Sequence, residues 1–369
     1  MSIDRRELLK AGLAVSAAAA LPNTARAEVD FAPHPGAWRN FQVLTRLEIG
    51  KADGKSQAWI PVPAVNEPDW FKSLGSTWTS NGRAALVREP KYGAEMLHVE
   101  WADGEPSPVV EVTSRIATRD RAIDLKKPGQ PAPLSAAERN RNTQGTELIP
   151  ADGIVKQTSD KIVADASAET DIEKARAIYE WIVDNTYRDP TVRGCGIGDI
   201  AAMLRTGNFG GKCADLNALY VGLARAAGLP ARDVYGIRVA PSRLGYKSLG
   251  AGSAVITKAQ HCRSEVYLAG FGWVPVDAAD VRKAVLEEPP TNLAIDDPKV
   301  VAARKALFGA WETNWLAYNF AHDVALPGSR GPKLGFLMYP QAETASLRLD
   351  CLDPDNFKYT ITAKELTAA

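Results

Sequence analysis

Short stretches that alternate apolar and polar residues dominate the first third of the chain. Clusters of Gly, Asp and Pro separate these stretches, which cover residues 41–49, 58–62, 96–101 and 109–116. Alternation with a period of two places successive side chains on opposite faces of a strand. Regularly spaced short strands with turn signals between them are typical of an antiparallel sandwich. We therefore expect a β-sandwich domain over residues 28–127.

The pattern becomes helical after residues 128–152, a Pro-, Gly-, Asn- and Arg-rich segment that indicates a linker or an extended stretch. Thr170 and Glu173 form a candidate capping box, and apolar residues follow at helical spacing. A second helix is predicted from Cys213 to Ala227, because apolar residues recur at helical spacing and a glycine and a proline follow its end.

The remaining segments suggest a catalytic domain over residues 153–285 and a C-terminal helical and β extension over residues 286–369. Strands are expected at 233–239, 262–268 and 273–276, a helix at 299–318 and a last strand near 358–362. Together with the sandwich, these elements predict an α+β protein.

Composition narrows the class of protein. The chain has 369 residues, with 44 Lys and Arg against 44 Asp and Glu. This balance gives no reason to expect nucleic acid or an anionic membrane as a partner. The four cysteines are too few for a disulfide scaffold. A disulfide from Cys195 to Cys351 or Cys262 stays open at this level.

Residues 1–27 have the pattern of an export signal. A charged start precedes the apolar residues 11–21, and residues 25–27 (ARA) fit a small-x-small cleavage site. The apolar part is shorter than the roughly 20 residues of a membrane-spanning helix. The run DRRELLK at 4–10 resembles a bacterial twin-arginine signal, the alternative being a Sec signal that contains two arginines. We expect a periplasmic or secreted protein without a stable membrane anchor.

Cys213 is the first candidate for chemistry. It opens the second predicted helix directly after Asn208-Phe-Gly-Gly-Lys212. A thiol at a helix N-terminus faces free backbone N–H groups and the positive end of the helix dipole, which both favour the nucleophilic thiolate. The alternative is a buried structural cysteine.

A base and a group that orients it follow in the chain. His261 starts a predicted strand, and a glycine-containing turn leads into a second strand that ends at Asp277. In a hairpin centred near Ala269, His261 and Asp277 would lie opposite each other on one face, and a shifted centre would offset them. Such a pair could hold the Cys213 thiolate and later protonate a leaving group.

These residues resemble the motifs of bacterial transglutaminase-like proteins. Gly210-Gly-Lys-Cys213 followed by LARAAGLPAR at 223–232 is similar to their cysteine motif. His261 with Glu265, and then GWVPVD at 272–277, is similar to their histidine and aspartate motifs. The resemblance covers residues 150–285 and implies a papain-like fold with Cys213, His261 and Asp277 as catalytic triad. It also implies that a sandwich precedes the core.

One position departs from the family pattern. Many such sequences carry an aromatic residue two places after the histidine, where this chain has Arg263. Strand alternation places Arg263 and Glu265 on the His261 face and Cys262 on the other. Arg263 could therefore line the cleft and select an acidic substrate, or it could pair with Glu265 or Asp280.

An acyl-transfer site also needs donors for an oxyanion. The Cys213 N–H is one candidate. Further candidates for the oxyanion site or the cleft are Tyr187, Asn208, Gly211 and Lys212, with Trp181 fitting the helix core better.

No metal and no cofactor are predicted. The spacings of Cys195, Cys213, His261 and Cys262 match no compact zinc motif, and no EF-hand-like acidic run occurs. The glycine-rich run GCGIG at 194–198 is too short for a dinucleotide fingerprint.

The favoured function is cleavage of an amide or peptide bond through a Cys213 thioester, with a peptide or protein, for instance a cell-wall peptide, as substrate. The first alternative is a transglutaminase that transfers the acyl group to an amine. The second is a non-catalytic binding or scaffold protein on the same fold.

Overall fold

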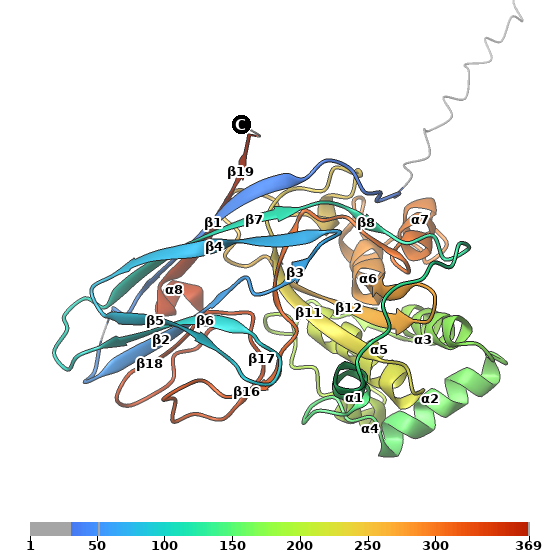
Figure 1. Cartoon of the computed structure of the whole chain (residues 1–369), viewed down its shortest axis with the longest axis horizontal. Helices are drawn as coiled ribbons and strands as arrows, with labels where there is room; N and C mark the ends of the chain where they lie inside the picture. Colours follow the sequence, from blue (N-terminus) through green and yellow to red (C-terminus); the bar gives the residue numbers. More distant parts are fainter. Residues whose placement is uncertain (1–30, 51, 368–369) are drawn as a thin grey trace, which may run out of the picture.

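The computed structural model describes residues 31–50 and 52–367. The predicted export signal lies outside these residues. Figure 1 shows a β-rich half, which contains most of the N-terminal strands, and a half in which helices surround a smaller sheet.

Two antiparallel sheets form the β-rich half. One has the order β19-β1-β7-β4-β3 and the other the order β18-β2-β6-β5. The strands from the first part of the chain are β1 (Arg39–Glu48), β2 (Ser56–Val62), β3 (Asn66–Glu67), β4 (Phe71–Ser80), β5 (Arg83–Arg88), β6 (Glu95–Trp101), β7 (Val109–Thr118) and β8 (Arg121–Ala122). Alternate residues of β1, such as Phe41, Val43 and Leu47, are buried. The predicted antiparallel sandwich is confirmed.

The helical half surrounds an antiparallel sheet with the order β13-β12-β11-β15. Its elements up to residue 287 are α1 (Ala136–Thr143), α2 (Gly153–Asp165), α3 (Asp171–Asn185), β9 (Tyr187–Arg188), α4 (Ile200–Thr206), β10 (Gly210–Gly211), α5 (Cys213–Ala226), β11 (Ala231–Arg238), the 3₁₀ helix η1 (Lys247–Leu249), β12 (Gln260–Leu268), β13 (Gly272–Val276) and α6 (Ala278–Glu287). The predicted α+β class is therefore observed.

Local sequence signals position α3 and α5. Thr170 and Glu173 form both hydrogen bonds of the capping box at the start of α3. Every residue of α5 is buried, and this helix packs against β12. Gly228 follows the end of α5 with a φ of 84°, a conformation that glycine adopts at little cost.

The C-terminal segment differs from the predicted helix at 299–318. Helix α7 (Pro298–Ala306) is followed by strands, namely β14 (Ala310–Trp311), β15 (Trp315–Asn319), β16 (His322–Val324), β17 (Leu334–Phe336), β18 (Gln341–Glu343) and β19 (Tyr359–Leu366), with α8 (Pro354–Phe357) before the last. Trp311 and Trp315 therefore lie on strands, where both are buried. Strands β18 and β19 pair with β2 and β1, so the end of the chain completes both sheets of the sandwich.

A buried charge cluster joins the two halves. The Glu265 carboxylate on β12 pairs with Arg121 on β8 and with Arg232 on β11, the latter at 2.6 Å. Arg232 also pairs with Glu67 on β3 at 2.8 Å. Glu265 is fully buried, so the two guanidinium groups compensate a charge that would otherwise be costly in the interior.

Across residues 31–50 and 52–367, none of the helices combines the length and apolar character that a membrane span requires.

Candidate active site

Cys213 is the first residue of α5 and lines a cleft of about 510 Å³. The Ala214 N–H donates a hydrogen bond to the Cys195 carbonyl at 2.8 Å. Among the described residues, the Cys213 N–H meets no acceptor. This first-turn amide therefore remains available beside the thiol, as expected for a helix N-terminus.

The glycine-rich run at 194–198 shapes this helix start. The Asp215 carboxylate on α5 accepts hydrogen bonds from the N–H groups of Ile197 and Gly198, and also from that of Lys212. Gly196 has a φ of 94°, and a Cβ at this position would lie 1.8 Å from Asp215 Oδ2. Only glycine lets the loop pass this close to α5, which fixes the backbone around Cys213.

His261 and Asp277 meet through the hairpin of β12 and β13. Ser264 pairs with Val276 and Leu268 with Gly272, so the hairpin is centred at residue 270 and not at 269. Asp277 therefore lies diagonal to His261 and not opposite it. The two side chains are still in contact, because His261 Nε2 lies 2.7 Å from Asp277 Oδ2. Because Nε2 makes this contact, Nδ1 is the ring nitrogen that can exchange a proton with Cys213.

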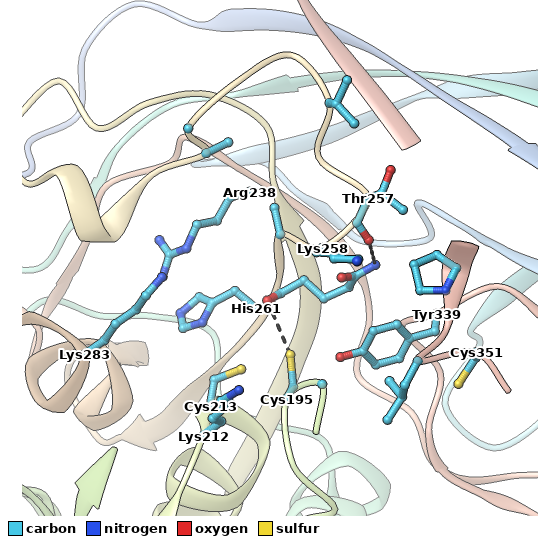
Figure 2. A pocket seen from close by; sticks show the side chains of 18 of the residues that line it. Cys195, Lys212, Cys213, Arg238, Thr257, Lys258, His261, Lys283, Tyr339 and Cys351 are labelled. Carbon is cyan, nitrogen blue, oxygen red and sulfur yellow. Dashed lines mark hydrogen bonds between the residues drawn. The ribbon is translucent and has the colours of Figure 1, made fainter. Parts of the chain in front are cut away.

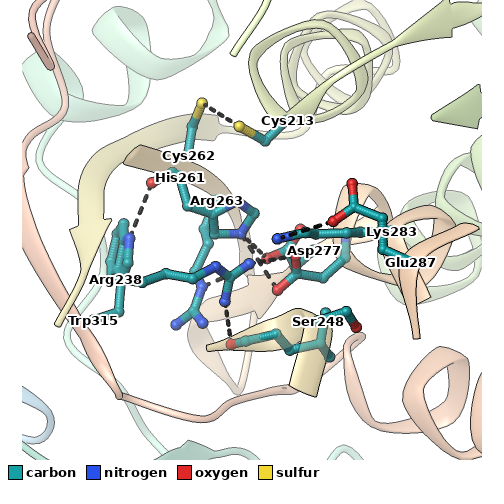
Figure 3. A network of polar contacts seen from close by, with 12 residues as sticks. Cys213, Arg238, Ser248, His261, Cys262, Arg263, Asp277, Lys283, Glu287 and Trp315 are labelled. Carbon is teal, nitrogen blue, oxygen red and sulfur yellow. Dashed lines mark hydrogen bonds and ion pairs between the residues drawn. The ribbon is translucent and has the colours of Figure 1, made fainter. Parts of the chain in front are cut away.

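Further groups hold this pair in place (Figure 3). The Asn217 side-chain amide on α5 donates to Asp277 Oδ1 at 3.1 Å and to the Cys262 carbonyl at 2.9 Å. The Trp315 indole N–H donates to the His261 carbonyl at 3.0 Å. Asp277 also caps α6, since its Oδ1 accepts from the Asp280 N–H at 3.0 Å. Asp277 and His261 are both buried, so their orientation is fixed by packing.

A second carboxylate faces the histidine. Asp280 Oδ2 lies 3.4 Å from His261 Nε2, and Asp280 Oδ1 lies 2.6 Å from the Arg238 guanidinium. Asp280 stands three residues after Asp277 at the start of α6, a spacing that places both near one helix face. From the sequence, Asp280 is a candidate only as a partner for Arg263.

These contacts favour a charged histidine. Burial and Arg238 lower the pKa of His261, but Asp280 and Asp277 more than offset them and raise it from 6.5 to about 9. Burial raises the pKa of the Cys213 thiol, yet hydrogen bonds from Cys195, Cys262 and His261 bring it well below its usual value. Near neutral pH the site therefore favours a thiolate beside an imidazolium.

Three sulfur atoms gather at the nucleophile. The thiol groups of Cys195, Cys213 and Cys262 all lie within 4.8 Å of one another. The Cys262 thiol donates to Cys213 Sγ at 3.5 Å, and the Cys195 thiol donates to the Gln260 carbonyl at 3.3 Å. All four cysteines of the chain are free thiols in this structure. Sulfur donors in such a group suit a soft metal ion, whereas His261, Asp277 and Asp280 form a second, separate set of donor atoms.

Arg263 lies in the interior and not in the cleft. Its side chain is about 2% exposed, and it donates to the Glu312 carbonyl at 2.9 Å. Its Nε lies 3.5 Å from Asp277 Oδ2, and the guanidinium stacks over Trp315 at 4.8 Å. The predicted role in selecting substrate therefore does not fit this position. The predicted pair with Glu265 is absent as well, because Arg121 and Arg232 occupy that carboxylate.

Of the other cleft candidates, only Lys212 lines the cavity. The Tyr187 hydroxyl donates to Asn208 Oδ1 at 3.1 Å, and both residues belong to the exposed β9–β10 region outside the cavity lining. Gly211 is buried, and a Cβ there would lie 2.6 Å from the Asp215 Cβ. Trp181 packs against Phe209 in a T-shaped contact.

The C-terminal segment forms one wall of the cleft (Figure 2). Cys213 and His261 face residues that come from the loop before β18 and from the segment around α8, namely Tyr339, Cys351, Leu352, Pro354 and Tyr359. No motif marks these positions in the sequence. They reach the site because β18 and β19 return to the sandwich.

The comparisons with known proteins agree with this geometry. The model of the transglutaminase-like superfamily matches residues 156–278, which include all three predicted triad residues. An uncharacterized protein of Haemophilus influenzae is 39% identical over 332 residues, covering 85% of this chain and 88% of the relative.

A solved structure from Cytophaga hutchinsonii, described as that of a "putative cysteine protease", covers 92% of this chain and 94% of its own. Its TM-score is 0.57 and its sequence is 13% identical, so it demonstrates a shared fold. The motifs, the matched core and the fold together show that this chain belongs to the transglutaminase-like superfamily.

Proposed function

We propose that the protein is a thiol acyl-transfer enzyme that cleaves amide or peptide bonds through a thioester on Cys213. The observation that carries this proposal is the buried His261–Asp277 contact of 2.7 Å in the same site as a thiol at the start of α5. A nucleophile, a base and an orienting carboxylate are the groups that thiol acyl transfer requires.

In the first half of the reaction, the Cys213 thiolate attacks the carbonyl carbon, and the Cys213 N–H donates to the developing oxyanion. The intermediate collapses when the carbon–nitrogen bond breaks and the His261 imidazolium protonates the leaving amine. In the second half, the neutral imidazole takes a proton from water, which attacks the thioester. The carboxylic acid leaves, and the thiolate–imidazolium pair is restored.

The charge around the cleft supports water over an amine as the acceptor. Besides His261, five cationic side chains line the cavity, and none of its lining residues within the described chain is Asp or Glu. A protonated lysine side chain would enter this surrounding against electrostatic repulsion, whereas water would not. Transfer to amines is therefore the second candidate.

The place of action is part of the same proposal. We propose export through the twin-arginine signal at 4–10 to the periplasm, where cell-wall peptides and secreted proteins offer amide bonds. Fractionation of cells that produce the full chain, and of cells with both arginines replaced by lysine, would test this step.

The enzymatic proposal is tested by incubating the mature protein with a mixture of peptide amides, with and without a fluorescent primary amine. Mass spectrometry should show hydrolysed peptides and little amine adduct, and Cys213→Ala should abolish both. Predominant amine adducts would favour the transglutaminase alternative. Equal product with Cys213→Ala would overturn the role of Cys213. No product from a wild-type protein whose Cys213 also fails to react with iodoacetamide would favour a binding or scaffold role.

A further inference from the structure

The lining of the cleft is strongly one-sided in charge. Its ionised side chains other than the triad residues are Arg188, Lys212, Arg238, Lys258 and Lys283. They come from segments far apart in the sequence, namely β9, the start of α5, β11, the loop before β12, and α6. The chain as a whole has no net charge, so this concentration is local to the cleft.

The carboxylates that pair with these cationic side chains do not neutralise them completely. Glu287 is shared, because it pairs with Arg188 and lies 3.6 Å from the Lys283 ammonium. Asp280 is shared as well, between Arg238 at 2.6 Å and His261 at 3.4 Å. Lys212 takes part in no ion pair among the described residues.

Three of these cationic groups lie around Cys213 and His261. Lys212 adjoins Cys213 in the chain, and Figure 2 shows Arg238 and Lys283 on the far side of His261 from the thiol. Lys283 is largely buried, its side chain being 17% exposed. Burial and the neighbouring Arg238 lower the pKa of Lys283 and outweigh Asp280 and Glu287, so these carboxylates do not fully compensate the ammonium.

Lys258 differs from the rest. Its side chain is 69% exposed and lies 3.3 Å from Asp355 at the rim of the cleft. A solvent-exposed pair of this kind contributes little to binding energy. Arg188 pairs with Glu287, and the Arg238 side chain is 3% exposed and donates to Asp280 and to the Leu249 carbonyl. The cationic site is therefore formed by the ammonium groups of Lys212 and Lys283, with the buried charge of Arg238 beside them.

We propose that the cationic site formed by Lys212 and Lys283 binds a carboxylate of the acyl donor, next to the amide bond that Cys213 attacks. This inference rests on the proposed function, because it names the substrate class of the same nucleophile. An acidic side chain and a free terminal carboxylate present the same group, which can accept charge-assisted hydrogen bonds from an ammonium group. The expected substrate is thus an acidic peptide.

A matched pair of alkylating reagents tests the site without a known substrate. Iodoacetate and iodoacetamide both form a carbon–sulfur bond to the thiolate and release iodide, but only iodoacetate carries a negative charge. We define the preference of Cys213 as its iodoacetate rate over its iodoacetamide rate, divided by the same ratio for glutathione. The predicted preference is about tenfold at low ionic strength, and it falls as salt screens the charges.

Variants assign the preference to the named residues. Lys283→Met and Lys212→Met each remove a charge but keep an unbranched side chain, and each should lower the preference several-fold. Lys161→Met, on the exposed face of α2, is a matched control and should keep the wild-type preference. Because the two cleft lysines belong to different elements, a folding defect in one variant leaves the other as a test.

The outcomes separate this inference from the proposed function. A Cys213 that reacts rapidly with iodoacetamide but shows a preference near one would overturn the carboxylate site and leave the enzyme proposal intact. A Cys213 that is no more reactive than glutathione toward either reagent would overturn the enzyme proposal itself. Once a cleaved peptide is known, its Glu form should be cleaved about tenfold faster than its Gln form, and equal rates would also refute the site.

Discussion

Asp280→Asn should lower the pKa of His261 without removing the Asp277 contact. Raising the histidine pKa from 6.5 to about 9 corresponds to a preference for the imidazolium of about 3 kcal/mol. Two carboxylates produce this preference and outweigh burial and Arg238, which both disfavour the imidazolium. Asp277 lies 2.7 Å and Asp280 3.4 Å from Nε2.

Because the two carboxylates also offset burial and Arg238, loss of one should cost at least half of the net preference, about 2 kcal/mol, which is more than one pH unit. Arg238 would also lose its partner at 2.6 Å, and its uncompensated charge would lower the histidine pKa further. The His261 pKa should therefore fall by at least one pH unit from about 9.

The assay is an NMR titration of the histidine ring signals. The chain contains only four histidines, and the missing signal in His261→Ala assigns the relevant one. Asp355→Asn is a matched control, since this carboxylate is 85% exposed at the cleft rim and pairs with Lys258. An unchanged His261 pKa in folded Asp280→Asn would refute the electrostatic reasoning.

Three further predictions concern the cluster between the halves, the helix start and the sulfur group. Glu265→Gln should lower the free energy of unfolding by about 3–5 kcal/mol, because it leaves two buried guanidinium groups without their shared carboxylate; a loss below 1 kcal/mol in chemical denaturation would contradict the role of this cluster. Gly196→Ala should slow alkylation of Cys213 and reduce stability, since the new Cβ would overlap Asp215; a wild-type melting temperature and rate would show that the loop can move away. Cys262→Ala should raise the pKa of Cys213, because it removes a hydrogen bond to that sulfur; an unchanged pH dependence of alkylation would exclude this contribution.

The parts of the fold that local patterns determine could be predicted. The capping box of α3 and the boundaries of α5 depend on residues within a few positions of each helix end. The hairpin could be predicted as well, but its centre stayed open, because turn geometry decides the register.

The parts of the fold and of the site that depend on distant contacts could not be predicted from the sequence. Residues 307–318 have helical spacing of their large apolar residues, yet β15 is stabilised as a strand by pairing with β11. The sequence allowed Arg263 to line the cleft or to pair with Glu265 or Asp280, but it lies inside, where it contacts two tryptophans and the Asp277 carboxylate. The cationic residues that line the cleft come from separate elements, so no single segment of the sequence indicates this concentration of charge.

The central claim is that Cys213 is a thiolate held by His261. The most direct test alkylates the mature protein with iodoacetamide at graded pH and maps the modified cysteine by mass spectrometry, beside His261→Ala. An ordinary thiol with a pKa of about 8.5 is well under 1% ionised at pH 6. The account predicts that Cys213 reacts at pH 6 at least tenfold faster than such a thiol and that His261→Ala removes this advantage. A rate at pH 6 equal to that of a free thiol, or one unaffected by His261→Ala, would contradict it.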